Sequence, residues 1–81
     1  TVHYWRTSGG AEVDCVIDTG DKLIPIEIKT SAHIARSELK GLKVFLEDYN
    51  KQTPHGYVVS LLAKKREMLA KNITLVPWNY L

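Results

Sequence analysis

The residues whose types and spacing could do chemistry lie in two neighbouring segments, A-E-V-D at 11–14 and I-E-I-K at 26–29. Apolar and polar residues alternate with period 2 in both segments, which is typical of half-buried strands. Between them lies T-G-D-K at 19–22, and its glycine can adopt the positive φ that a tight hairpin turn needs. We therefore predict a β-hairpin over residues 11–30.

The position of this turn fixes a register for the two strands. Folding the hairpin about the midpoint of the turn places Asp14 opposite Glu27. Glu12 then lies opposite Lys29, and the apolar residues form pairs of their own, Val13 with Ile28, Cys15 with Ile26 and Ile17 with Ile24. All apolar pairs are expected on one face and all ionisable pairs on the other, because a slip of one residue would place carboxylates opposite isoleucines.

The pairing of Asp14 with Glu27 is the feature that indicates a function. Directly opposed residues have Cβ atoms roughly 4.5–5.5 Å apart, so two ionised carboxylates there need a cation, a shared proton or a specific role. Together they could hold a hard divalent cation such as Mg²⁺, which prefers carboxylate oxygens. Lys29 projects from the same face, where an ammonium group beside a metal helps to activate water and to neutralise a phosphate oxygen.

A purely structural interpretation of these charges stays open. Half-buried hairpins often carry charges on their solvent face, and Glu12 opposite Lys29 would then be a surface ion pair worth about 0–1 kcal/mol. The pair of Asp14 and Glu27 fits this alternative poorly, because like charges that are directly opposed destabilise a sheet.

Length and composition are those of one small folded domain. The 81 residues are 44% hydrophobic and 25% charged, and the net charge of +2 is too small to indicate nucleic-acid binding by itself. The single cysteine, Cys15, excludes an internal disulfide framework and is expected to be a small core residue in a reducing compartment. The sequence has neither an apolar run of roughly 18 residues nor a secretory signal, so we expect a cytoplasmic protein without a membrane span.

The remaining pattern places the hairpin in a mixed sheet. Strands are expected at 1–6, 57–62 and 73–76, whereas 64–71 fits either a short helix or a basic loop. A strand, a helix and a strand in succession imply a right-handed crossover and a parallel neighbour for the strand of Glu27. The expected fold class is α/β, with a mixed, mainly antiparallel sheet of four or five strands and one crossover helix in the order β-β-β-α-β-β.

The crossover helix is expected to start between Ile34 and Ser37 and to end at Tyr49, with Ser37 as a plausible N-cap. Its apolar residues recur at helical spacing and form one stripe, which consists of Leu39, Leu42, Phe45, Leu46 and Tyr49. Gly41 either weakens the helix by about 1 kcal/mol relative to alanine or allows close packing on the sheet.

Asp14 in the second strand, with Glu27 and Lys29 as E-x-K in the third, resembles the motif of the PD-(D/E)xK, or restriction-endonuclease-like, nuclease superfamily. The longer runs W-R-T-S-G-G-A-E-V-D, I-P-I-E-I-K-T-S, G-L-K-V-F-L-E-D-Y and G-Y-V-V are similar to an uncharacterised C-terminal domain that follows an AAA+ ATPase module in many prokaryotic proteins. The likeness extends from about Tyr4 to Trp78. It implies a single nuclease-like domain over 1–81, with a truncated restriction-endonuclease-like core, as the C-terminal fragment of a longer ATPase-containing protein.

This resemblance implies hydrolysis of phosphodiester bonds in nucleic acid, with DNA as the expected partner and Mg²⁺ or Mn²⁺ as the cofactor. Asp14 and Glu27 would bind the metal, together with the main-chain carbonyl of Ile28. Lys29 would position or deprotonate the attacking water, or stabilise the developing charge. Glu12 would bind a second ion or hold Lys29.

The sequence also departs from the superfamily. Many members take a further acid from a helix ahead of the first strand, and no such helix is indicated here. A P-loop motif is absent as well, so ATP binding would belong to an upstream module. The alternative function is therefore a catalytically inactive module that keeps these residues and binds DNA, a protein partner or the ATPase. The sequence leaves the oligomeric state open.

Overall fold

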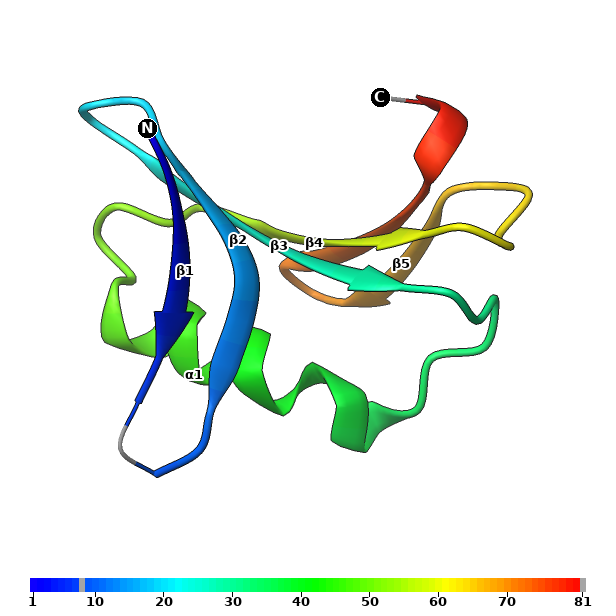
Figure 1. Ribbon diagram of the computed structural model, residues 1–81, viewed down its shortest axis with the longest axis horizontal. Helices are drawn as coiled ribbons and strands as arrows, with labels where there is room; N and C mark the ends of the chain where they lie inside the picture. Colours follow the sequence, from blue (N-terminus) through cyan, green and yellow to red (C-terminus); the bar gives the residue numbers. More distant parts are fainter. Residues whose placement is uncertain (8, 81) are drawn as a thin grey trace.

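A computed structural model of the chain describes residues 1–7 and 9–80. Its described part is a six-stranded sheet with one α-helix packed against β2 and β3 (Figure 1). The elements follow one another as β1 (Val2–Arg6), β2 (Glu12–Asp18), β3 (Leu23–Lys29), the 3-10 turn η1 (Arg36–Leu39), α1 (Lys40–Asp48), β4 (Gly56–Ser60), β5 (Glu67–Ala70), β6 (Ile73–Pro77) and the 3-10 turn η2 (Trp78–Tyr80). The predicted α/β class is confirmed. A search of the described residues finds no helix with the length and apolar character of a membrane span.

The sheet is mixed, and its strand order is β1-β2-β3-β4-β6-β5. The first three strands form an antiparallel meander, and β5 is antiparallel to β6. The two central pairs, β3 with β4 and β4 with β6, are parallel. The predicted parallel neighbour for the strand of Glu27 is therefore confirmed, and α1 lies in the crossover that connects the two strands.

The sheet has more strands than the four or five predicted, because β5 forms in the segment that fitted either a helix or a loop. Its sequence, Glu-Met-Leu-Ala, consists of good helix formers. The segment nevertheless pairs with β6 at the edge of the sheet, with an irregular register between Met68 and Ala70. Tertiary pairing has overridden the local preference of these four residues.

The hairpin of β2 and β3 has the predicted register. Cys15 pairs with Ile26 and Ile17 pairs with Ile24. The turn is closed by a hydrogen bond from the backbone N–H of Thr19 to the carbonyl of Lys22 at 3.0 Å. Gly20 has a φ of 101°, which explains the glycine at this position.

The face of the hairpin that packs against α1 differs from the prediction, and a β-bulge brings Val13 to that face. Val13 and Val16 are 0% and 4% exposed and belong to the same core, although strict alternation would place them on opposite faces. The pairing of β1 with β2 shifts between His3 and Trp5. An extra residue in β2 at this point brings both valines to one face.

The ionisable side of β3 is the side that the helix covers, because Pro25 lies opposite the buried Val16. Glu27 is level with Val58 of β4 in the parallel register, so their side chains share a face. Val58 is fully buried in the core with the leucines of α1. The isoleucines expected to be buried lie on the opposite face, where Ile24 and Ile26 are half-buried and Ile28 is 53% exposed.

The helix itself begins later than predicted. Residues 36–39 form the 3-10 turn η1, α1 starts at Lys40, and Ser37 is not an N-cap. The predicted apolar stripe is buried at four of its five positions, whereas Tyr49 is 37% exposed. Gly41 lies directly on β2, since a Cβ atom there would be 2.1 Å from the carbonyl oxygen of Glu12. Close packing on the sheet is therefore the correct interpretation of this glycine.

Candidate active site

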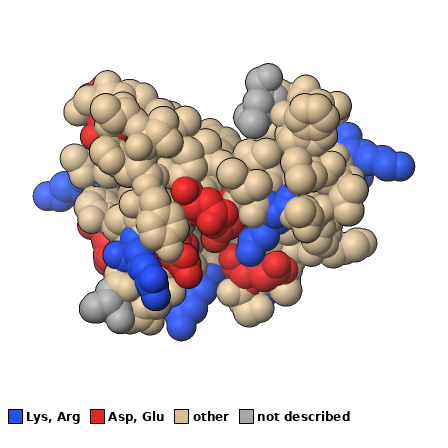
Figure 2. Space-filling model, viewed as in Figure 1, with Lys and Arg blue, Asp and Glu red and all other residues tan. Residues whose placement is uncertain are grey.

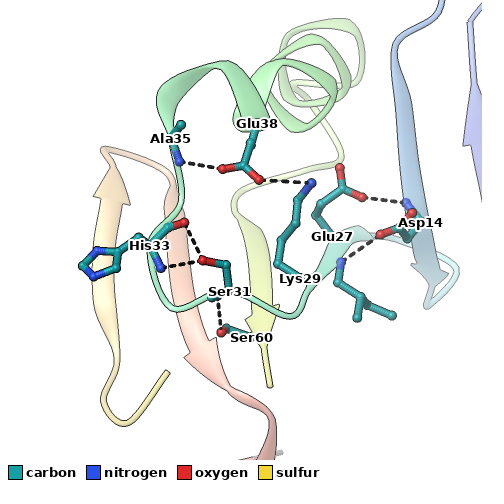
Figure 3. Close-up of polar contacts among 9 residues, drawn as sticks. Asp14, Glu27, Lys29, Ser31, His33, Ala35, Glu38 and Ser60 are labelled. Atoms are coloured by element: carbon teal, nitrogen blue, oxygen red, sulfur yellow. Dashed lines mark hydrogen bonds and ion pairs between the residues drawn. The ribbon is translucent and has the colours of Figure 1, made fainter. Parts of the chain in front are cut away.

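The candidate site lies where β2 and β3 stop pairing through their backbones, next to the pair formed by Cys15 and Ile26. Beyond that pair, the side-chain carboxylates of Asp14 and Glu27 accept hydrogen bonds across the two strands in place of backbone carbonyls. The backbone N–H of Asp14 donates to Glu27 Oε1 at 3.3 Å, and the backbone N–H of Ile28 donates to Asp14 Oδ2 at 2.9 Å (Figure 3). The structure thus brings Asp14 and Glu27 together, and each carboxylate is held by the backbone of the opposite strand.

The two carboxylates have different environments. Asp14 is exposed, whereas Glu27 is only 9% exposed. Burial raises the pKa of Glu27 to about 7, and the side-chain carboxyl of Asp14 acts in the same direction through a hydrogen bond and through its charge, whereas the hydrogen bond from the backbone N–H of Asp14 lowers this pKa. The charge of Lys29 lowers the pKa of Glu27, but by less than burial raises it. A protonated or partly protonated Glu27 at neutral pH is the expected state of a crowded carboxylate pair that no cation neutralises.

The main-chain carbonyl of Ile28 completes an oxygen donor set. The carbonyl of Lys29 accepts a hydrogen bond from the N–H of Leu61, which follows β4, at 3.0 Å. Successive residues of a strand turn their backbone groups to opposite neighbours. Because the N–H of Ile28 points to Asp14, the carbonyl of Ile28 also faces the β2 side.

These donors fit a magnesium ion. Two carboxylates and a carbonyl are hard oxygen ligands, and Mg²⁺ usually binds through one or two carboxylates while it keeps several waters. Within 1–7 and 9–80, three or more His, Cys, Asp or Glu side chains do not gather at any point. Water or substrate oxygens would therefore supply the remaining ligands.

Lys29 points from the same side of β3 as Glu27 and reaches toward η1 (Figure 3). Its Nζ lies 3.7 Å from Glu38 Oε1. Glu12, which was expected to hold Lys29, instead accepts a hydrogen bond from the hydroxyl of Tyr4 on β1. The bulge in β2 and the end of the ladder at Cys15 account for this difference, because Glu12 no longer lies opposite Lys29.

Glu38 is a residue of the site that sequence reasoning missed. Its Oε2 accepts the backbone N–H of Ala35 at 2.8 Å, while its own N–H donates to the Ala35 carbonyl at 3.0 Å. The first bond is one half of a capping box; the second is a backbone bond of the 3-10 turn, because alanine has no side chain that could accept the N–H of Glu38. A glutamate three residues after the cap position is half of the sequence pattern of a capping box, and Glu38 matches it. The pattern is incomplete here, because alanine stands at the cap, where serine or threonine is usual.

Ser60 fixes the loop that joins Lys29 to Glu38. The side chain of Ser60 is fully buried, and its hydroxyl donates to the carbonyl of Ser31 at 2.6 Å. The same oxygen accepts the N–H groups of Leu62 at 3.2 Å and Ala63 at 3.0 Å. The segments that follow β3 and β4 are thereby tied together beside the site.

Charged side chains of both signs lie together on one face of the molecule. Figure 2 shows acidic side chains gathered near the middle of the face that it presents, with basic side chains beside them.

The fold and the site together define a small α/β domain that carries a carboxylate pair and a lysine at the end of its central hairpin. The chain belongs to the family described as a domain of unknown function, DUF4143, whose model matches residues 1–81. The expected likeness to an uncharacterised domain family is confirmed to this extent. No curated protein and no solved structure matches the chain.

Proposed function

We propose that this domain is a metal-dependent nuclease that hydrolyses phosphodiester bonds, with DNA as the substrate class and an AAA+ ATPase module in the same polypeptide. One observation carries the proposal. Asp14 and Glu27 are hydrogen-bonded to each other's strands, and the side chain of Lys29 leaves the same side of β3 two residues further on. The resemblance of these three positions to the PD-(D/E)xK motif supports it.

Asp14, Glu27 and the carbonyl of Ile28 would hold Mg²⁺ or Mn²⁺. A bound ion of this kind lowers the pKa of a coordinated water and withdraws charge from a phosphoryl oxygen. Occupation of the site favours the ionised form of Glu27, because the ion stabilises the charge that burial disfavours. The exposed Asp14 leaves one side of the site open to a polymeric substrate.

Lys29 would act on the substrate rather than on the metal. Its ammonium group has three N–H donors and no acceptor, so in this form it can orient a water or stabilise charge on a phosphate oxygen. The ion pair with Glu38 keeps the group near the carboxylates. We therefore assign Lys29 the roles of orienting the attacking water and stabilising the developing charge.

The experiment that tests the proposal is DNA cleavage by the full-length protein with Mg²⁺ or Mn²⁺. We expect Lys29→Ala to reduce the cleavage rate about 100-fold or more, as removal of a preorganised charge-stabilising donor does in other enzymes. Lys43→Ala, which removes an exposed lysine of α1, is the matched control and should cleave at the wild-type rate. Equal rates in the wild-type protein and Lys29→Ala would contradict the proposal.

The second candidate function is a non-catalytic module that binds DNA or a protein partner. The small donor set favours it, because the described residues place no group of three His, Cys, Asp or Glu side chains where they could hold one metal ion. Such a module would retain binding without metal-dependent turnover.

A further inference from the structure

We propose that Glu38 is a positioning residue, which holds the ammonium group of Lys29 beside the carboxylate pair and keeps it from pairing with those carboxylates. The inference rests on the proposed function and adds a residue from η1 to the site.

The backbone of Lys29 is fixed, but its side chain needs a partner to have a defined position. Lys29 is the last residue of β3, and its carbonyl is held by the N–H of Leu61. The ammonium group ends a flexible four-carbon side chain, so its position is set by the carboxylate with which it forms an ion pair. Glu38 is that partner, with 3.7 Å between Nζ and Oε1.

Glu38 is itself restrained, so it can define the position of another group. One carboxylate oxygen faces Lys29, and the other accepts the N–H of Ala35 at 2.8 Å. The side chains of Lys29 and Glu38 are only 28% and 35% exposed, which places the pair partly out of solvent. An ion pair with one partner locked by a second hydrogen bond loses less side-chain entropy than a free surface pair.

The carboxylates of Glu27 and Asp14 compete with Glu38 for the ammonium group of Lys29. Glu27 lies two residues from Lys29 on the same face of β3, and the charge of Lys29 stabilises its ionised form. Without Glu38, the ammonium group would be drawn to Glu27 and Asp14, the oxygens that a metal ion needs. Glu38 therefore separates the cationic side chain from the cation site while keeping both in reach of one substrate.

The decisive variant is Glu38→Gln, because an amide oxygen can still accept the N–H of Ala35 while the charge beside Lys29 is lost. In metal-free protein, ¹⁵N relaxation of the Lys29 ammonium group should show greater mobility or a new partner in Glu38→Gln. Glu47→Gln, which neutralises an exposed acid of α1, should leave the ammonium group unchanged. An identical Lys29 signal in Glu38→Gln and the wild-type protein would overturn the inference, whether or not the protein cleaves DNA.

The catalytic readout is a double-mutant cycle. Glu38→Gln should lower kcat about tenfold with little change in KM, and it should have no further effect when Lys29 is already alanine. An equal loss in both backgrounds would show that Glu38 acts independently of Lys29 and would overturn its positioning role. A wild-type protein that does not cleave at all would instead contradict the proposed function.

Thermal unfolding separates these effects from loss of the fold. Glu38→Gln should unfold at the wild-type temperature, whereas Glu38→Ala should unfold at a lower temperature because it also removes the hydrogen bond to Ala35. A kcat as high in Glu38→Ala as in the wild-type protein would count against the inference.

Discussion

Glu27 combines three conditions that rarely meet at one carboxylate. It is buried, it accepts a backbone hydrogen bond from a neighbouring strand, and it faces a second carboxylate. Each condition changes the balance between its charged and neutral forms, and burial is the largest influence. A group of this kind makes protein stability depend on pH, so the site can be probed without a substrate.

The free energy of unfolding should fall as pH rises from about 4.5 to about 7 in metal-free protein. The pKa of Glu27 is 4.5 in the unfolded reference and about 7 in the folded protein, so the folded state binds more protons in this window. The stabilisation that Glu27 contributes is therefore fully present below pH 4.5 and is lost as the pH rises through 7. The expected loss is on the order of 3 kcal/mol, because a difference of one in the pKa corresponds to about 1.4 kcal/mol.

Urea unfolding at a series of pH values, with a chelator present, measures this effect. Glu27→Gln should flatten the profile between pH 4.5 and 7, and Glu47→Gln should retain it. A profile with the same slope in Glu27→Gln and in the wild-type protein would show that other groups cause the dependence.

At the scale of elements, the position of α1 on the sheet depends on one glycine. Gly41 allows the helix backbone to approach the carbonyl of Glu12, which is two residues from Asp14. The same helix follows η1, the turn that carries Glu38. The contact between α1 and β2 therefore influences both sides of the candidate site.

Gly41→Ala should destabilise the protein by about 1–3 kcal/mol, because an added methyl group would overlap the backbone of β2. Helix propensity alone predicts the opposite sign, a gain of about 1 kcal/mol. Chemical denaturation measures the difference, with Lys43→Ala as an exposed control on the same helix. A more stable Gly41→Ala protein would contradict the close contact.

At the scale of the whole molecule, the two faces of the sheet differ in what covers them. One face carries the core and α1, with Glu27 and Lys29 near its margin. The other face has a shallow pocket of about 380 Å³ whose lining is mostly apolar, formed by Ile24, Ile26, Tyr57, Val59, Arg66, Val76 and Tyr80. The candidate ligand Glu27 thus belongs to the face whose packing defines the fold, and metal binding should be coupled to global stability.

In solutions at a pH above 7, Mn²⁺ or Mg²⁺ should raise the unfolding temperature of the protein. An ion that binds only the folded state at ten times its Kd stabilises that state by about 1.4 kcal/mol, or several degrees for a domain of this size. Asp14→Asn should abolish the shift, and Asp48→Asn, at an exposed position of α1, should keep it. Equal shifts in the two variants, or none in the wild-type protein, would favour the non-catalytic module.

The sequence by itself determined the central hairpin, its register and the parallel strand that follows the helix. These features depend on local order, namely a glycine in the turn, period-2 alternation and the handedness of a crossover. The same local order was sufficient to predict that Asp14 and Glu27 meet. The apolar stripe of the helix was also predicted, because its spacing is set by the helix itself.

Only the tertiary structure decided which face of the hairpin is buried, where Lys29 points and that residues 67–70 form a strand. The face of Val16, Pro25 and Glu27 is buried because β4 and α1 pack there, and a bulge in β2 adds Val13 to that face by changing the face of the residues beyond it. The ion pair of Lys29 with Glu38 joins segments that no periodicity relates. Residues 67–70 became a strand because β6 offers an unpaired edge, and an edge of that kind exists only after the sheet has formed.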